Sequence, residues 1–330
     1  RTGADAQLSG VIVVDEPGQR TPRDRIFLLG AWTDSASSEL NRRRNRELFV
    51  INGRAWPLTD RIQYEQGDSV RWRVVNTTTD AHPMHLHGTH FQAFRRGDGR
   101  ADTILSARDP VHTEYLAAGG TMQLGWQANR LGNWLFHCTE PAHIAARGTL
   151  GFPPQMTPMD PAGTPAMGGL VSGVEVLRLE DDTATPPPLP EPSRRIRMVL
   201  RRNVGSTPYR PYYGVAVTDT GFDAVEELGQ RAGAPIVLTR GEHVSIMVHN
   251  RTPEPTSIHW HGMEVDSYYD GVAGFSGIRP EVAPAIAPND SFEVRMTPSR
   301  SGTFHYHAHA NERHQRAGLV GAVVVTDQAN

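Results

Sequence analysis

The sequence predicts an all-β protein made of two β-sandwich domains. Helical periodicity is weak along the chain, whereas short β-branched runs lie between clusters of glycine, proline and asparagine. The chain has 330 residues, about twice the ~150 residues typical of one domain, so two separate cores are expected. The predicted strands include Val11–Val14, Val70–Val75, Ile236–Thr239 and Val323–Thr326.

An internal repeat indicates that the two domains are of one kind. The segment GDSVRWRVVN (Gly67–Asn76) matches GEHVSIMVHN (Gly241–Asn250), and each leads nine residues later to an H-x-H-G element. Further along, RLGNWLFHCT (Arg130–Thr139) matches RSGTFHYHAH (Arg300–His309). The sequence therefore predicts two copies of one β-domain.

The domain boundary is predicted in a proline-rich stretch. Residues 181–193 read DDTATPPPLPEPS, which suits an extended linker between domains at 21–180 and 194–330. Residues 1–20 are interpreted as a terminal strand centred on LSGVIVVDE (Leu8–Glu16). This strand is either an extra strand or the remnant of an upstream domain of the same kind.

Composition excludes several function classes. Mean hydropathy is −0.45 and no apolar run approaches the ~20 residues that cross a bilayer, so no membrane span is expected. The net charge is −3 and no long basic tract is present, so nucleic acid is not an expected partner. All 33 basic residues are arginine, which excludes chemistry that needs lysine, and the single cysteine excludes an intrachain disulfide.

Histidines gather in four short segments that hold ten of the 15 histidines. On a strand, residues i and i+2 face the same side, so each H-x-H pair directs two imidazoles into one space. Four such segments in matching repeat positions predict metal binding. The segments are HPMHLHG (His82–Gly88), HCTEPAH (His137–His143), HWHG (His259–Gly262) and HYHAH (His305–His309).

The donor types indicate the metal. Imidazoles with one thiolate suit copper or zinc, and one cysteine is too few for a cysteine-rich structural zinc site. Cys138 and His143, five residues apart, combine with His82 from another strand into the His2Cys set of blue copper. The remaining histidines are too numerous for that site and form a second cluster, which His137 connects to Cys138 through the chain.

These motifs resemble those of the multicopper oxidases, the laccase-like family of cupredoxin domains, over nearly the whole chain. The resemblance implies Greek-key β-sandwich (cupredoxin-like) domains and a type 1 copper that takes electrons from a substrate. It also implies a cluster of one type 2 copper and a type 3 pair that reduces dioxygen to water. Carried over by motif, the type 1 ligands are His82, Cys138 and His143, the type 2 ligands are His85 and His259, and the type 3 pair takes His87, His137, His261, His307 and His309.

The segment SYYDGVAG (Ser267–Gly274) resembles the acidic turn of the family, whose aspartate helps to deliver protons to the cluster. Asp270 holds that position, so Asp270 joins Cys138 as a predicted catalytic residue. An Asp-Gly pair is also a common turn former, and the two interpretations are compatible.

The chain departs from the family pattern in its domain order. The family usually places HWHG before HPxHLHG, and here the domain with the type 1 motif comes first. Ligands of the trinuclear cluster come from both domains in either order, within a chain or between chains. In two-domain members of the family they come from neighbouring subunits of a trimer, so a homotrimer is expected.

Two further departures concern single positions. Thr139 stands where the family has a histidine ligand of a type 3 copper, so His305, His314, Glu140 or water completes that site, or the site is partly empty. His305 falls where the family has an aromatic residue and is interpreted as a polar flanking residue. The axial type 1 position follows an insertion and is aligned with Leu170, which would raise the copper potential; Met167 is the alternative.

The predicted function is that of a laccase-like multicopper oxidase. It would couple one-electron oxidation of phenolic, aromatic or metal-ion substrates to reduction of dioxygen, with dioxygen and a small reductant as partners. The alternatives are a nitrite-reductase-like copper enzyme and a copper-binding or electron-transfer protein with an impaired cluster. The resemblance and the use of copper favour a periplasmic or secreted protein.

Overall fold

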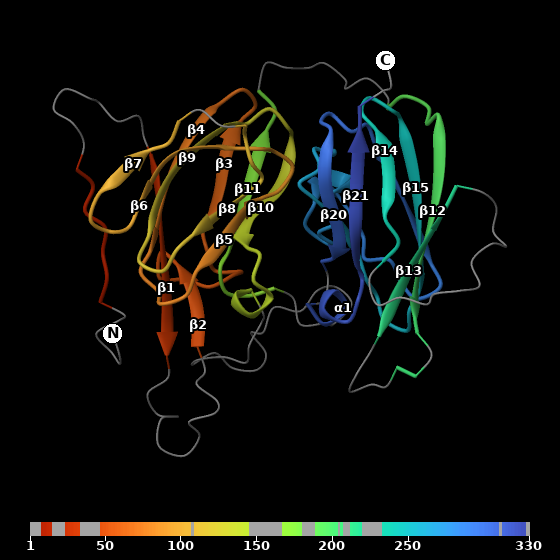
Figure 1. Ribbon diagram of the computed structural model, residues 1–330, viewed down its shortest axis with the longest axis horizontal. Helices are drawn as coiled ribbons and strands as arrows, with labels where there is room; N and C mark the ends of the chain where they lie inside the picture. The colour runs from red at the N-terminus through yellow and green to blue at the C-terminus, as the bar shows by residue number, and fades with distance from the viewer. Residues whose placement is uncertain are drawn as a thin grey trace. The chain divides into compact units, whose positions relative to one another are not determined.

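The computed structural model describes residues 8–14, 24–33, 47–106, 109–144, 167–179, 189–203, 205–206, 212–219, 233–309 and 312–327. These residues divide into two compact units, each made of two β-sheets (Figure 1). Of the described residues, the first unit takes in those up to 129 together with 134–144 and 167–177, and the second takes in residues 130–133 and those from 178 onward.

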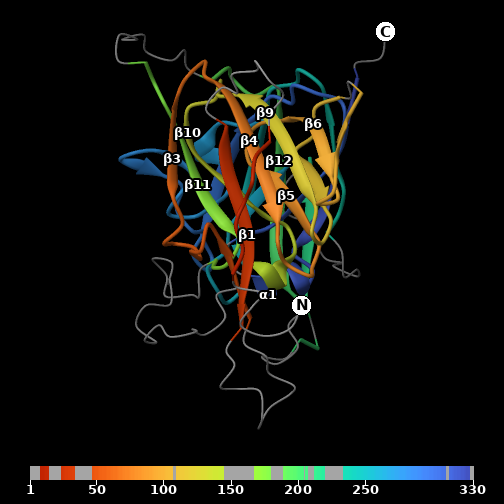
Figure 2. The same ribbon diagram turned by 90° about the vertical axis from the view of Figure 1, so that its left-hand side faces the viewer.

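The first unit has one sheet in the order β2-β1-β4-β9-β6-β7 and a second that contains β10-β11-β3, with β5 beside β10 and β8 beside β5. Figure 2 shows β1, β4 and β9 of the first sheet. The strands are β1 (Arg25–Thr33), β2 (Glu47–Ile51), β3 (Arg61–Glu65), β4 (Ser69–Asn76), β5 (His82–Leu86), β6 (Gln92–Gly97), β7 (Asp102–Ile104), β8 (Thr113–Leu116), β9 (Thr121–Gln127), β10 (Gly132–Cys138) and β11 (Val171–Leu177), and the 3-10 helix η3 (Pro141–His143) follows β10.

The second unit has sheets in the orders β13-β12-β15-β19 and β14-β21-β20-β16. A short hairpin and two short helical segments complete its described part. Its elements are β12 (Arg194–Arg202), β13 (Tyr213–Thr218), β14 (Ile236–Thr239), β15 (Val244–Arg251), β16 (Ile258–His261), η5 (Ser267–Tyr269), β17 (Gly277–Ile278), β18 (Glu281–Val282), β19 (Ser291–Met296), β20 (Gly302–Ala308), α1 (Glu312–Arg316) and β21 (Val320–Thr326).

The two units share one topology. β4 pairs in parallel with β1 and antiparallel with β9, and β15 pairs in the same way with β12 and β19. β11 with β3 and β21 with β14 form a second equivalent parallel pair. Consecutive strands such as β3, β4 and β5 alternate between the two sheets, as Greek-key connections require. The predicted all-β fold of two cupredoxin-like sandwiches is confirmed.

Alternating apolar residues build each core. In β4, Val70, Trp72 and Val74 are buried and the residues between them are more exposed. The Trp72 ring lies 4.9 Å from that of Phe27 and 4.8 Å from that of Phe136, between ring centroids. The second unit buries the corresponding face of β15 against β20 and β21 in one apolar cluster. Hydrophobic burial between two sheets therefore holds the strand ends that carry the histidines.

A buried asparagine ends the repeated strand in each unit. The Asn76 side-chain amide donates to the carbonyls of Asp80 and Ala117, and its Oδ1 accepts from the N–H and the hydroxyl of Thr78. Asn250 makes the equivalent bonds with Glu254, Ile286 and Thr252. The sequence repeat is thus reproduced bond for bond, just before each H-x-H-G element.

The described part of the N-terminal region differs from the prediction. Residues 8–14 form no strand, and Leu8, Ile12 and Val14 are almost fully exposed. This apolar segment pairs with no strand of the described chain, so β-propensity alone did not order it. Most of the predicted linker, residues 181–188, and most of the predicted insertion, residues 145–166, lie outside the described residues. Within the described residues, no helix has the length and apolarity needed to span a membrane.

We expect Asn76→Ala and Asn250→Ala each to lower the free energy of unfolding by about 2–4 kcal/mol, because each leaves buried backbone groups without partners. Chemical denaturation followed by tryptophan fluorescence measures the loss. Asn129→Ala, at an exposed site, is the control and should change stability by less than about 0.5 kcal/mol. Equal stability of all three variants would contradict the assigned role of the two asparagines.

Candidate metal centres

The first centre brings together a thiol and two imidazoles. Cys138 ends β10 and lies opposite Met84 of β5, so strand alternation places His82 and Cys138 on the same face. The short helix η3 then returns His143 to the thiol. The Nδ1 atoms of the two histidines are 3.0 Å apart, and Sγ is 3.7 Å from His82 Nδ1 and 3.5 Å from His143 Nδ1.

Neighbouring groups orient this centre. Thr78 Oγ1 lies 2.7 Å from His82 Nε2, so an N–H at Nε2 puts the lone pair on Nδ1, which faces the thiol. The Phe49 ring packs against both imidazoles, with centroid distances of 5.4 Å to His82 and 4.2 Å to His143. The sequence motifs predicted that these three donors lie together, as the structure has them. Phe49 and Thr78, which contact the imidazoles, come from other segments.

The backbone around Leu170 fixes the same centre. The Leu170 N–H donates to the His143 carbonyl, and the Leu170 carbonyl accepts from the Cys138 N–H, both at 3.1 Å. Gly169 has φ +62°, and a Cβ there would lie 2.0 Å from the His143 carbonyl oxygen, so this approach needs glycine. Leu170 is fully buried and Met167 partly exposed. The axial assignment to Leu170 or Met167 stays a prediction.

The donor chemistry suits copper. Burial raises the pKa of the Cys138 thiol to about 12. Burial, together with the nearby His143, lowers the pKa of His82 to about 3. Without a metal, both groups are therefore neutral at pH 7. Three donors bonded to one ion at about 2.1 Å would lie about 3.6 Å apart, close to the observed 3.0–3.7 Å. One thiolate with two imidazoles is the donor set that copper prefers.

A second cluster lies on the other face of β10. His137 pairs directly with His85 of β5, and His87 follows β5. Ring centroids in this trio are 4.9–5.5 Å apart, and the Nε2 atoms of His87 and His137 are separated by 2.8 Å. His137 Nδ1 donates to the Cys138 carbonyl at 2.7 Å, which puts a lone pair on Nε2. Two ring nitrogens that face each other in a buried space fit a shared cation.

The second unit carries a third cluster. His259 on β16 pairs with His307 on β20, and the donor atoms of His259, His261 and His307 lie within 4.8 Å of one another. His259 Nδ1 donates to the Asp270 carbonyl at 2.7 Å, and His307 Nδ1 to the Ala308 carbonyl at 3.0 Å. The His309 ring centroid lies 5.2 Å from that of His259. Four predicted ligands of the second unit therefore gather in one place.

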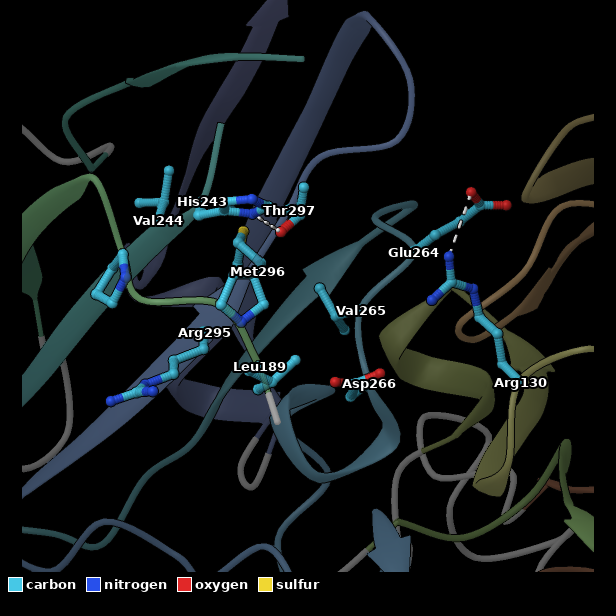
Figure 3. Close-up of a pocket in the computed structure, with 12 residues that line it drawn as sticks. Arg130, Leu189, His243, Val244, Glu264, Val265, Asp266, Arg295, Met296 and Thr297 are labelled. Atoms are coloured by element: carbon cyan, nitrogen blue, oxygen red, sulfur yellow. Dashed lines mark hydrogen bonds and ion pairs between the residues drawn. The ribbon is translucent and has the colours of Figure 1, made fainter. Parts of the chain in front are cut away.

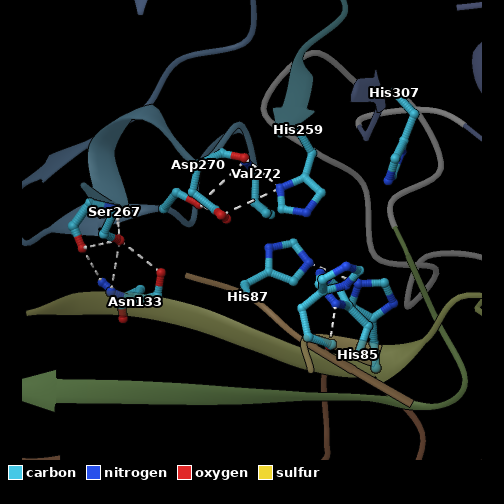
Figure 4. A network of polar contacts seen from close by, with 12 residues as sticks. His85, His87, Asn133, His259, Ser267, Asp270, Val272 and His307 are labelled. Atoms are coloured by element: carbon cyan, nitrogen blue, oxygen red, sulfur yellow. Dashed lines mark hydrogen bonds and ion pairs between the residues drawn. The ribbon is translucent and has the colours of Figure 1, made fainter. Parts of the chain in front are cut away.

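Asp270 lies directly beside this cluster and is fully buried (Figure 4). Its Oδ2 accepts a hydrogen bond from the Ser276 hydroxyl at 3.1 Å, and its Oδ1 is 3.4 Å from His259 Nδ1. The next residue, Gly271, has φ +89°, and a Cβ there would lie 1.9 Å from the Ile258 carbonyl oxygen. Glycine thus allows the turn to reach β16 and to place a carboxylate next to His259, a predicted ligand.

The structure separates the candidates for the ligand missing at Thr139. His314 has Nε2 2.7 Å from Glu254 Oε2 and Nδ1 3.2 Å from Thr256 Oγ1, so both its nitrogens are engaged away from the clusters. Glu140 is exposed and caps η3, accepting from the Ala142 N–H at 3.5 Å. His314, one of the predicted alternatives, is therefore not directed at the cluster. His305 stacks on His261 with centroids 4.2 Å apart.

One further histidine, His112, lies beside His85 although it belongs to none of the four histidine segments. The β-bridge between Phe91 and Val111 and the pairing of β8 with β5 bring this histidine to His85, with ring centroids 5.6 Å apart. The His112 carbonyl accepts from both His85 Nδ1, at 2.7 Å, and the Leu86 N–H, at 3.1 Å. His112 belongs to no H-x-H pair, so the spacing of histidines gave no signal for it.

A separate pocket of about 240 Å³ lies in the second unit (Figure 3). Its wall includes Glu264, Arg130, Asp266 and Arg295, and Glu264 is ion-paired with Arg130 at 3.7 Å. None of the predicted metal ligands is among its lining residues. The pocket is therefore distinct from the histidine clusters.

Sequence comparison identifies the class of protein. Two family profiles, both described as multicopper oxidase, match residues 31–152 and 225–330 and together cover more than half of the chain. The chain belongs to the multicopper oxidase family.

Individual relatives match over shorter stretches. Copper resistance protein A of Escherichia coli is 34% identical over 85 residues, which are 26% of this chain and 13% of that protein. Laccase-6 of Arabidopsis thaliana is 33% identical over 146 residues, 42% of this chain and 23% of that protein. The matched region thus spans less than a quarter of either relative. A solved copper nitrite reductase from Nitrosomonas europaea is 14% identical with a TM-score of 0.32, and the match covers 93% of this chain and 95% of that one.

We expect copper affinity at the Cys138 centre to rise about tenfold per pH unit between about pH 7 and pH 10, because the thiol must lose its proton to bind. The sign follows from a metal-free pKa of about 12: the thiol is protonated throughout this range, so binding releases one proton. Competition with a chelator of known affinity measures the slope. Cys138→Ser should lower the affinity and remove the slope, and a pH-independent affinity in the unmodified protein would contradict the proposed thiolate ligand.

Proposed function

We propose that this protein is a laccase-like multicopper oxidase that oxidises phenolic, aromatic or metal-ion substrates one electron at a time and reduces dioxygen to water. Copper bound at the two kinds of centre supplies the redox chemistry, accepting electrons at the His2Cys centre and delivering them to dioxygen at the histidine cluster. The observation that carries the proposal is the adjacency of His137 and Cys138, which belong to different centres on opposite faces of β10.

The residues have separate tasks in this proposal. Cys138, His82 and His143 hold type 1 copper, and burial keeps water away from the thiolate. The peptide bond between Cys138 and His137 gives a short covalent path to the cluster. His85 and His259 are proposed for type 2 copper, and the type 3 pair is proposed to take His87, His137, His261, His307 and His309.

Metal analysis combined with an oxygen electrode tests the function. We expect the copper-loaded protein to hold copper beyond the type 1 ion, to show the intense visible band of a copper–thiolate bond, and to consume oxygen with a phenol or a reduced metal ion. Nitrite consumption without oxygen uptake would favour the nitrite-reductase-like alternative. A blue protein with type 1 copper alone would favour the electron-transfer alternative.

Asp270 is proposed to hold the proton that dioxygen reduction consumes. Asp270→Asn preserves the size of the side chain and an acceptor for Ser276 but removes the titratable carboxylate. Turnover should fall roughly 10²-fold with copper content and the visible band unchanged. Steady-state oxygen uptake measures this, and an undiminished rate would assign Asp270 to the turn alone.

The proposed assembly is a homotrimer, since the family resemblance assigns trinuclear ligands to two domains and a cyclic assembly satisfies every interface identically. Light scattering of the copper-replete protein should give the mass of three chains. A copper-replete monomer would exclude the trimer. The proposed location is the periplasm or the cell exterior.

A further inference from the structure

Four of the seven predicted cluster histidines share one hydrogen-bonding pattern. His85, His137, His259 and His307 each place Nδ1 on a backbone carbonyl oxygen, at 2.7–3.0 Å. A proton on Nδ1 fixes the ring and puts the lone pair on Nε2, as a metal ligand requires. This pattern gives a criterion for a ligand histidine that does not depend on sequence spacing. His314 does not meet it, because both its nitrogens have protein partners.

His112 has a related environment. Its Nδ1 lies 2.9 Å from the hydroxyl oxygen of Thr113 and not from a carbonyl oxygen, and in the tautomer that donates this hydrogen bond the lone pair is on Nε2. Its ring centroid is 5.6 Å from that of His85, within the 4.9–5.7 Å found between the rings of the predicted ligands on neighbouring positions. A ring nitrogen of His112 also lies within 4.8 Å of one of His85, so the ring is placed like that of a ligand.

The backbone holds His112 firmly in this position. Its carbonyl is the acceptor that orients His85, so any shift of His112 also moves a ligand. Val111 and Phe91 exchange backbone hydrogen bonds of 2.9 and 2.8 Å on one side, and Thr113 pairs with His85 on the other. Because the backbone is fixed on both sides, only the side-chain torsions of His112 remain to be ordered when it binds an ion.

The same unit lacks an imidazole at another position. In the internal repeat, Thr139 corresponds to His309 of the second unit. The Thr139 N–H donates to the Pro83 carbonyl at 2.9 Å, and its hydroxyl is a poor copper donor beside the imidazoles that copper prefers. The first unit therefore contributes one histidine fewer from β10 to its cluster and has an additional oriented histidine at the edge of β8.

We propose that His112 is a copper ligand of the His85, His87 and His137 cluster and offsets, in the number of imidazole donors, the one that Thr139 does not supply. This proposal rests on the proposed function, because it assumes that the cluster binds copper. It predicts that the protein retains its full complement of cluster copper despite Thr139.

The test compares His112→Gln with His243→Gln, measuring copper per chain by metal analysis. Glutamine can keep the contact with Thr113 but lacks the imidazole donor, so His112→Gln should lose about one copper per chain. His243 is the matched control, because its Nδ1 lies 2.8 Å from a threonine hydroxyl, Thr297 Oγ1, in the separate pocket. His243→Gln should keep all its copper. The visible band of the type 1 centre, in the same unit as His112, reports folding.

A second-site variant tests the compensation directly. Adding Thr139→His to His112→Gln should restore the lost copper, whereas adding it to His243→Gln should not change the copper content. If His112→Gln retains all its copper, the proposal is wrong while the proposed function stands. If the unmodified protein binds only type 1 copper, the proposed function fails first and the His112 assignment fails with it.

If His112→Gln loses the visible band and so does not fold, chemical labelling of the unmodified protein tests the proposal instead. Diethyl pyrocarbonate modifies accessible histidines, and His112 is half-exposed. In the unmodified protein, His112 should react when copper is removed and be protected at least about tenfold when copper is restored, since ligation occupies its lone pair. Peptide mass mapping measures this, with His243 as the unprotected reference. Equal labelling of His112 in both states would overturn the proposal.

Discussion

The alternation of side chains at the end of β10 is the constraint on which both centres of the first unit depend. His137 and Cys138 are adjacent in the chain and therefore face opposite sides of the strand. One face meets His82 and the other meets His85, because β5 alternates in register with β10. A shift of the register by one residue would exchange the thiol with an imidazole and destroy both centres. The buried core of the sandwich fixes that register.

Backbone oxygens account for most of the orientation of the predicted ligands. Carbonyls of Cys138, Asp270 and Ala308 each accept from the Nδ1 of a neighbouring histidine. These oxygens belong to strands and turns that are held by many other hydrogen bonds, so the tautomer of each ring is set by the fold. The clusters are therefore organised before a metal binds, and the neutral state of Cys138 and His82 lowers the cost of burying them without one.

The sequence predicted what local spacing and the repeat encode. The i, i+2 pairs such as His259 and His261, and the return of His143 to Cys138 within five residues, need only strand alternation and a short turn. His112 reaches His85 because Val111 pairs with Phe91 and β8 pairs with β5. The spacing of residues along the chain does not predict contacts of this kind. For Leu8–Val14 the sequence predicted a strand that the structure does not have. Residues with high β-propensity form a strand only where a partner strand is available.

The repeat also explains why the second unit has no counterpart of the Cys138 centre. Ala308 corresponds to Cys138 and Thr256 to His82, so at least two of the three donors are absent there. His314 fills this region: it is fully buried, contacts Thr256 and Glu254, and packs against Tyr213 with centroids 5.0 Å apart. Burial lowers its pKa and the Glu254 carboxylate opposes that shift, which is the balance expected of a histidine with a structural role. One copy of the domain thus combines a cysteine–histidine group with a histidine cluster. The other copy also has a histidine cluster, but a hydrogen-bonded core takes the place of the cysteine–histidine group.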